Sequence, residues 1–140
     1  MEFFKQNDSA FDGKMFLKGK IVLLADDSTP LRRLLATILT KEGAKILESD
    51  NGAGVLEMLA MKKIDLVLMD IHMPVIDGLT TAKIIKNCDK YNSIPVVLIS
   101  SDHAILDAVK KNRNHADGFI YKPFSRHTIL TQMFDALGTH

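Results

Sequence analysis

Short apolar segments alternate with helical patterns along most of this chain, and that alternation constrains the fold more than any other feature. The five segments cover residues 21–25, 44–48, 66–69, 96–99 and 119–121. The first, third and fourth are apolar at nearly every position, which is typical of strands buried on both faces of a parallel sheet. The second alternates between apolar and polar residues, which favours an edge strand.

Between and after these segments, apolar residues recur at spacings of three and four, the pattern of an amphipathic helix. Each stripe is expected to face the core. The stripes are marked by residues such as Leu31, Leu34 and Leu35, Val55 and Leu59, Ala82, Ile84 and Ile85, Leu106 and Val109, and Ile129, Met133 and Phe134. Ser28, Asp77 and Ser125 are predicted helix N-caps. Because parallel strands need crossover connections, the sequence predicts an α/β fold with a doubly wound five-stranded parallel sheet flanked by five helices, in a flavodoxin-like topology.

Length and composition limit the classes of protein that this chain can belong to. Its 140 residues correspond to one domain, and 18 basic against 17 acidic side chains give a net charge of +1. This balance predicts no direct binding to nucleic acid or to a membrane. Cys88 is the single cysteine, which excludes an internal disulfide, and no secretion signal is recognised, so we expect a cytoplasmic location.

The first 19 residues differ in composition from the rest of the chain. They contain four of the seven phenylalanines, namely Phe3, Phe4, Phe11 and Phe16. We therefore divide the chain into an N-terminal extension or tail, residues 1–19, and a folded domain, residues 20–140. Two interpretations of the extension stay open: a linker remnant, or a short element that docks on this domain or on a second copy.

Acidic residues follow two of the predicted strands. Asp26 and Asp27 follow the first strand and Asp70 follows the third. The carboxyl ends of parallel strands meet at one edge of the sheet, so these side chains are expected to converge there. Two like charges about 4 Å apart repel by roughly 4 kcal/mol at an effective dielectric constant of 20, so such a cluster favours a bound cation. Because the ligands are carboxylate oxygens, the cation that the sequence predicts is Mg²⁺, with Mn²⁺ as an acceptable substitute.

Two further side chains at the same edge complete a site for phosphoryl transfer. Ser100 ends the fourth strand and supplies a hydroxyl, and Lys122 follows the fifth strand and supplies a positive charge. A carboxylate can be the nucleophile and form an aspartyl phosphate, and Asp70 is the candidate because its strand is central in this topology. A flavin-mononucleotide carrier is disfavoured, since Asp26 and Asp27 would repel its phosphate.

With these residues, the chain resembles the receiver domain of response regulators, the phosphoacceptor module of two-component signalling. The resemblance spans roughly residues 18–137. It depends on several motifs in order: the acidic pair Asp26-Asp27, the segment 69–74 followed by Asp77-Gly78, the strand 95–100, and Lys122-Pro123-Phe124. Each motif alone is weak, but together they are specific.

The resemblance implies a role for each matching position. Asp70 resembles the phosphorylated aspartate, Asp27 the direct Mg²⁺ ligand, and Asp26 a ligand acting largely through water. His72 occupies a position whose backbone carbonyl binds the metal. Other implied roles are the switch hydroxyl, the aromatic switch residue and the lysine that pairs with phosphoryl oxygens, at Ser100, Phe119 and Lys122 respectively.

Three functions follow, from different classes. The first is a phosphoacceptor that is not an enzyme and that receives its phosphoryl group from a histidine kinase or a histidine phosphotransfer protein. Phosphorylation then switches a surface that a downstream protein binds, and the domain is expected to be a monomer or a weak homodimer. The second is a non-phosphorylated interaction module with the same fold. The third, an aspartate-dependent phosphatase, is disfavoured because His72 stands where such enzymes place a second acid.

Overall fold

The computed structural model describes residues 15–112 and 115–138. It contains one five-stranded sheet, formed by β1 (Ile21–Ala25), β2 (Lys45–Ser49), β3 (Leu66–Asp70), β4 (Val96–Ser100) and β5 (Gly118–Tyr121). All neighbouring strands are parallel and lie in the order β2-β1-β3-β4-β5. The predicted sheet is confirmed, with β2 at an edge and β3 in the centre.

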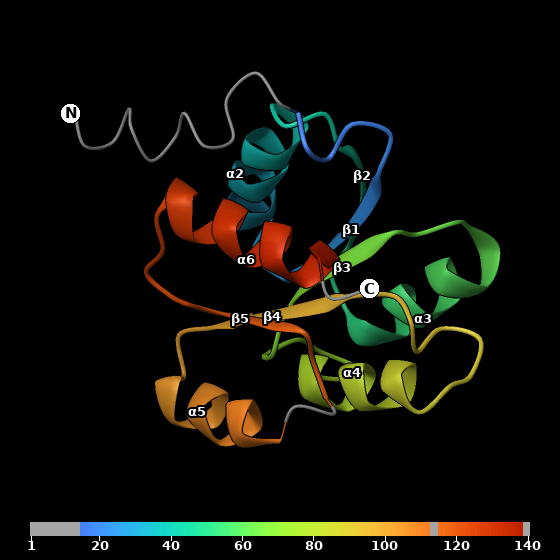
Figure 1. The fold of residues 1–140 in the computed structure, drawn as a ribbon. Helices are drawn as coiled ribbons and strands as arrows, with labels where there is room; N and C mark the ends of the chain where they lie inside the picture. Colours follow the sequence, from blue (N-terminus) through green and yellow to red (C-terminus); the bar gives the residue numbers. More distant parts are fainter. Residues whose placement is uncertain (1–14, 113–114, 139–140) are drawn as a thin grey trace.

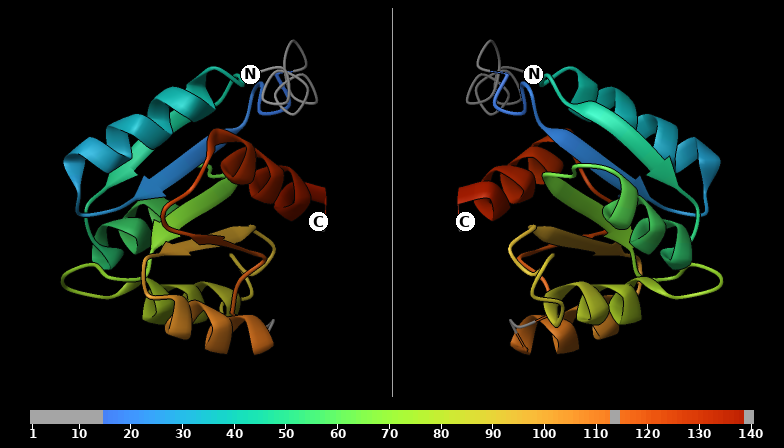
Figure 2. Two further views of the ribbon diagram at one scale, coloured as in Figure 1. Left: turned by 90° about the vertical axis from the view of Figure 1, so that its left-hand side faces the viewer. Right: turned by 90° about the vertical axis from the view of Figure 1, so that its right-hand side faces the viewer.

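The helices cover both faces of this sheet, as predicted for a doubly wound fold (Figure 1). They are α2 (Thr29–Thr40), α3 (Gly52–Met61), α4 (Gly78–Lys86), α5 (His103–Lys111) and α6 (Arg126–Gly138). Figure 2 shows α2 and α6 on one face and α3, α4 and α5 on the other. None of the described helices combines the length and apolar character that crossing a membrane requires.

The core consists of two apolar layers, one on each face of the sheet. Alternate residues along a strand point to opposite faces, so Val22 and Leu24 pack under α2 and α6, whereas Leu23 and Ala25 pack against the other helices. All residues of β3 and β4 are buried, which explains why these segments are continuously apolar. The sheet is therefore held rigidly, and its carboxyl edge is a fixed platform.

Side chains at the helix starts accept backbone hydrogen bonds as expected. The Ser28 hydroxyl accepts from Leu31 N at 3.4 Å, Asp77 Oδ1 accepts from Thr80 N at 2.7 Å, and Ser125 Oγ accepts from Thr128 N at 3.1 Å. These contacts satisfy amide groups that have no partner within the helix.

Three residues of the predicted core stripes are exposed instead. Leu34 is 50% exposed, Ile84 is 43% exposed and Phe134 is 53% exposed. Each lies at the margin of its stripe, which is wider than the surface that the sheet covers. For these positions the expectation of a core face was wrong.

The segment before β1 belongs partly to the packed body. Leu17 is fully buried in the layer under α2 and α6, and its amide donates to the carbonyl oxygen of Glu42 at 3.0 Å. Phe16 packs edge to face on Phe134 of α6. Packing thus extends to residues on the N-terminal side of position 20, while Phe3, Phe4 and Phe11 lie outside the described residues.

Candidate functional site

Asp26 lies directly after β1 and is held by three backbone contacts. Its amide donates to Ser49 O at 3.1 Å, its Oδ1 accepts from Ser28 N at 2.7 Å, and its carbonyl oxygen accepts from Arg32 Nη1 at 2.6 Å. Its side chain is 2% exposed. The turn into α2 thus fixes a buried carboxylate at the carboxyl edge of the sheet.

Asp70 and Lys122 meet at the same edge. Asp70 is the last residue of β3, and its Oδ1 accepts from His72 N at 2.9 Å, while its Oδ2 accepts from the Lys122 ammonium. The same ammonium lies 3.5 Å from Oδ2 of Asp26. One lysine therefore bridges two carboxylates from β1 and β3, and the predicted convergence of these residues is observed. The Lys122-Pro123 peptide bond is cis.

The two carboxylates, Asp26 and Asp70, together attract a positively charged group. Burial is the main cause that raises the pKa of the Asp26 carboxyl, and the neighbouring Asp70 raises it further. The Ser28 amide and Lys122 act in the opposite direction. Two carboxylates and one ammonium leave a net charge of −1 on side chains that are mostly shielded from water, so a further cation is attracted there.

The donor set is compatible with a hydrated divalent cation. Oδ2 of Asp26 is buried and accepts no hydrogen bond among the described residues, and the next side chain, Asp27, is exposed. Within the part of the chain that the structure describes, no three His, Cys, Asp or Glu side chains form a preassembled metal cluster. This arrangement suits Mg²⁺, which binds one or two carboxylates and completes its shell with water. The role of the His72 carbonyl stays a prediction.

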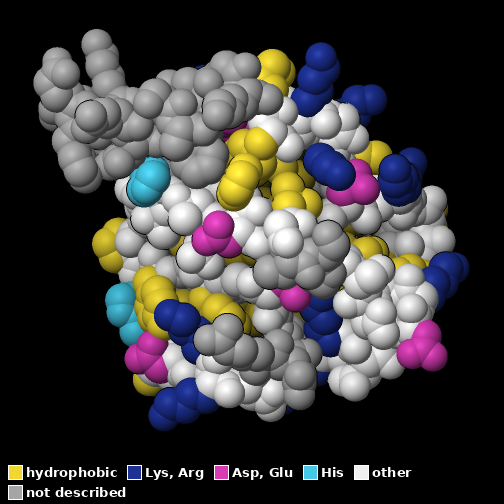
Figure 3. All heavy atoms as spheres, viewed as in Figure 1, with side chains coloured by type: hydrophobic (Ala, Val, Ile, Leu, Met, Phe, Trp, Pro, Cys, Tyr) yellow, Lys and Arg dark blue, Asp and Glu magenta, His cyan; other side chains and the backbone are white. Residues whose placement is uncertain are grey.

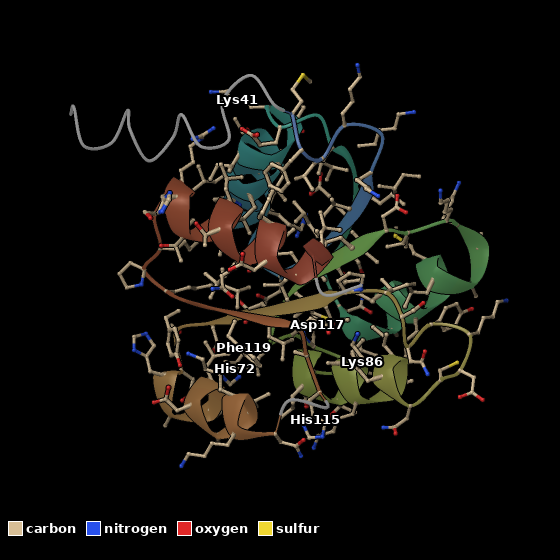
Figure 4. All side chains as sticks on the ribbon, viewed as in Figure 1. Lys41, His72, Lys86, His115, Asp117 and Phe119 are labelled. Carbon is tan, nitrogen blue, oxygen red and sulfur yellow. The ribbon has the colours of Figure 1, made fainter. Side chains whose placement is uncertain are left out.

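Ser100 ends β4, where its carbonyl oxygen accepts from Lys122 N at 3.0 Å, and Phe119 lies on β5, the next strand. The Ser100 hydroxyl is buried and accepts from Asp102 N at 2.9 Å. Phe119 is half-buried, packs with the layer under α3, α4 and α5, and donates its amide to Gln132 Oε1 at 3.0 Å. Figure 4 shows Phe119 and His72 on the α5 side of the sheet. The two predicted switch residues thus lie on β4, which pairs with the strand of Asp70, and on β5, which pairs with β4.

Several contacts around the centre were not predicted from the sequence. Arg32 joins the Asp26 carbonyl to Glu48 of β2, with its Nε 2.8 Å from Glu48 Oε1. His103 contributes Nε2 to a 2.8 Å hydrogen bond with the Lys122 carbonyl. The Arg32 contact had a signal, because long side chains in the first turn of a helix point back towards its start.

A second unpredicted pair lies at the mouth of the site. His72 Nε2 lies 3.7 Å from Asp102 Oδ2, and both side chains are substantially exposed. The pair connects the segment after β3 with the start of α5. The backbone amides of the same two residues donate to Asp70 and to Ser100, so the pair lies close to both site residues.

The fold and the site define the class of this protein as a doubly wound α/β domain with two carboxylates bridged by a lysine at the carboxyl edge of its sheet. The model of the response regulator receiver domain family matches residues 22–134. That range includes every element from β1 to most of α6, so the chain belongs to this family.

Curated relatives support the same assignment. The chain is 33% identical over 112 residues to Protein PilG of Pseudomonas aeruginosa, covering 80% of this chain and 83% of PilG. It is 38% identical over 119 residues to the chemotaxis protein CheY of Halobacterium salinarum, covering 84% of this chain and 97% of that protein. A third relative, the CAI-1 autoinducer sensor kinase/phosphatase CqsS of Vibrio cholerae, is 30% identical, but the chain spans only 16% of it.

Solved structures share the architecture. The receiver domain of a histidine kinase from Syntrophus aciditrophicus superposes with a TM-score of 0.77 at 27% identity, covering 86% of this chain and 92% of that one. The receiver domain of the sensor histidine kinase PA1611 from Pseudomonas aeruginosa also gives a TM-score of 0.77, at 19% identity, covering 86% and 98%. That second structure has a magnesium ion coordinated in its active-site cleft.

Proposed function

We propose that this domain accepts a phosphoryl group on Asp70 from a phosphohistidine of a histidine kinase or histidine phosphotransfer protein. The observation that carries the proposal is the Lys122 ammonium, which bonds to Asp70 and lies 3.5 Å from Asp26. A lysine in this position can pair with phosphoryl oxygens as the negative charge on them develops. We also propose a cytoplasmic location, where such donors reside.

The chemistry is a direct displacement at phosphorus. A carboxylate oxygen of Asp70 forms a bond to phosphorus, the phosphorus–nitrogen bond of the donor breaks, and the electron pair returns to the imidazole of the donor. The His72 amide orients Asp70 through Oδ1. Asp26, Asp27 and Asp70, with the His72 carbonyl, would hold Mg²⁺, which neutralises charge on the phosphoryl oxygens. The domain is consumed stoichiometrically in this step and is therefore not an enzyme.

The signal would pass from Asp70 through Ser100 and Phe119. A phosphoryl group offers new acceptors for the Ser100 hydroxyl, which in this structure accepts from Asp102 N. Movement of Ser100 would open space beside β5, and Phe119, which is only half-buried, can change rotamer. The outcome is a shift between two states of the surface around α5 and β5, read by a downstream protein.

Incubation with acetyl phosphate tests the proposal without knowledge of the donor. Intact-mass spectrometry should show one added phosphoryl group in the presence of Mg²⁺ and none in chelator. Asp70→Asn should remain unmodified, while Asp77→Asn, a helix-cap control whose side chain bonds to Thr80 and not to Lys122, should still be labelled. Labelling of Asp70→Asn would refute the assignment. Absence of labelling in the unsubstituted chain would favour the non-phosphorylated interaction module.

A further inference from the structure

A partly apolar hollow lies at the end of the molecule opposite the phosphorylation site. It measures about 300 Å³ and is lined by Phe16, Lys20, Phe134, Leu137 and Gly138. Lys20 immediately precedes β1, and Leu137 and Gly138 end α6, so the hollow opens beside the amino edge of the sheet. Asp70 ends β3 at the carboxyl edge, and the proposed function therefore makes no use of this hollow.

Aromatic rings form one wall of the hollow. Phe16 and Phe134 pack edge to face with ring centroids 5.5 Å apart and an interplanar angle of 67°. Phe134 is 53% exposed, and Met15, which precedes Phe16 in the chain, is 42% exposed. Figure 3 shows hydrophobic side chains at the surface where α2 and α6 lie in Figure 1. Such a surface, with space for an aromatic ring, is suited to an apolar ligand.

The chain itself carries aromatic side chains close to the rim. Residues 1–14 join the described structure at Met15 and contain Phe3, Phe4 and Phe11. Phe11 precedes Phe16 by five positions, so Phe11 can lie no more than about 18 Å along an extended chain from the wall of the hollow. Met15 has a φ of 44°, which lies in the left-handed region, and the sequence pair Asp12-Gly13 is of a kind that favours turns.

Tethering decides between this segment and a second copy of the protein as the occupant. A short flexible connection gives an effective concentration in the millimolar range. A second copy at micromolar concentration would need roughly a thousandfold tighter contact to compete. The hollow is small and holds about one or two rings, which is less than a stable dimer interface requires.

We propose that this hollow is the docking site for the phenylalanine side chains of the chain's own residues 1–14, with Phe11 as the nearest anchor. The N-terminal segment then belongs to the folded domain and covers the exposed edge of α6. Its docking is independent of Asp70 and of any phosphoryl group.

A double-mutant cycle in the full-length chain tests the docking. Phe11→Ser should lower the equilibrium constant for folding, measured by urea unfolding, about threefold to tenfold, the size expected for an aromatic contact. In a Phe134→Leu background, the same substitution should change it less than twofold. Ser9→Ala, a substitution in the same segment without an aromatic ring, serves as the control and should change it less than twofold.

Either of two results of the unfolding experiment would overturn the proposal. One is additivity, in which Phe11→Ser has the same effect with Phe134 and with Leu at that position. The other is coupling that disappears when the protein is diluted a hundredfold, because the occupant would then be a second copy. Amide chemical shifts give a measurement that does not depend on unfolding: Phe11→Ser should shift residues 16–20 and 134–138. Unchanged shifts in both segments would also overturn it.

Discussion

Replacing Asp26 with Asn is expected to stabilise the fold at neutral pH when no divalent cation is present. Asn keeps an oxygen that can accept from the Ser28 amide, so the substitution removes charge with little change in shape. The question is whether the lost attraction to Lys122 outweighs the repulsion and the burial cost that disappear with it.

The magnitudes favour stabilisation. With an effective dielectric constant of about 20, attraction across the 3.5 Å between Lys122 Nζ and Asp26 Oδ2 contributes about 5 kcal/mol, and repulsion from Asp70 opposes it. The pKa of Asp26 is nevertheless raised, with burial as the largest cause, so burial and the repulsion from Asp70 together outweigh the attraction to Lys122. We expect a gain on the order of 1 kcal/mol, the usual size of the effect of a single substitution.

The gain should depend on pH in a defined direction. Because the pKa of Asp26 is raised above its ordinary value of 3.8, the folded state holds this proton at pH values where the unfolded chain has released it. Stability from this group therefore rises as the pH falls towards 3.8, and the advantage of Asp26→Asn shrinks over the same range.

Urea unfolding followed by far-ultraviolet circular dichroism, in chelator at pH 7.5 and pH 4.5, measures both effects. Asp27→Asn is the matched control, since that side chain is exposed and should change stability by less than about 0.5 kcal/mol. A variant that is no more stable than the parent at pH 7.5, or whose gain is equally large at pH 4.5, would refute the reasoning. At saturating Mg²⁺ the parent should instead be more stable than Asp26→Asn, because the parent binds the cation more tightly.

Three further predictions concern the surroundings of the site. Arg32→Gln should weaken Mg²⁺ binding, measured by calorimetry, by about tenfold because the loop after β1 loses its clamp, whereas Arg33→Gln, with an exposed side chain, should not. Gly78→Ala should destabilise the fold by about 2 to 3 kcal/mol in urea unfolding, because a Cβ would collide with the backbone oxygen that ends β3. Tyr121 should ionise at lower pH in Asp107→Asn than in the parent, followed by tyrosinate absorbance, because its hydrogen bond to Asp107 raises its pKa.

The sheet and the main site residues could be predicted because they depend on patterns along the chain. Continuous apolar character marked β3 as central, and the parallel arrangement then required Asp26 and Asp70 to share an edge with Lys122. This inference needs strand order and direction but no side-chain conformations.

The contacts that could not be predicted depend on side-chain conformation. The His103 bond to the Lys122 carbonyl requires the particular approach of α5 to the end of β5, which periodicity does not specify. Helical spacing likewise identified Leu34 and Phe134 as apolar but not as exposed, because a stripe is wider than the surface that the sheet covers.

The location of the phosphoryl group is the most direct test of the central claim. After treatment with acetyl phosphate and Mg²⁺, borohydride reduction converts an aspartyl phosphate to homoserine, which peptide mass spectrometry locates. The account predicts homoserine at position 70 alone, with none formed in chelator. Homoserine at position 26 or 27, or a phosphoryl group elsewhere with residue 70 unchanged, would contradict it.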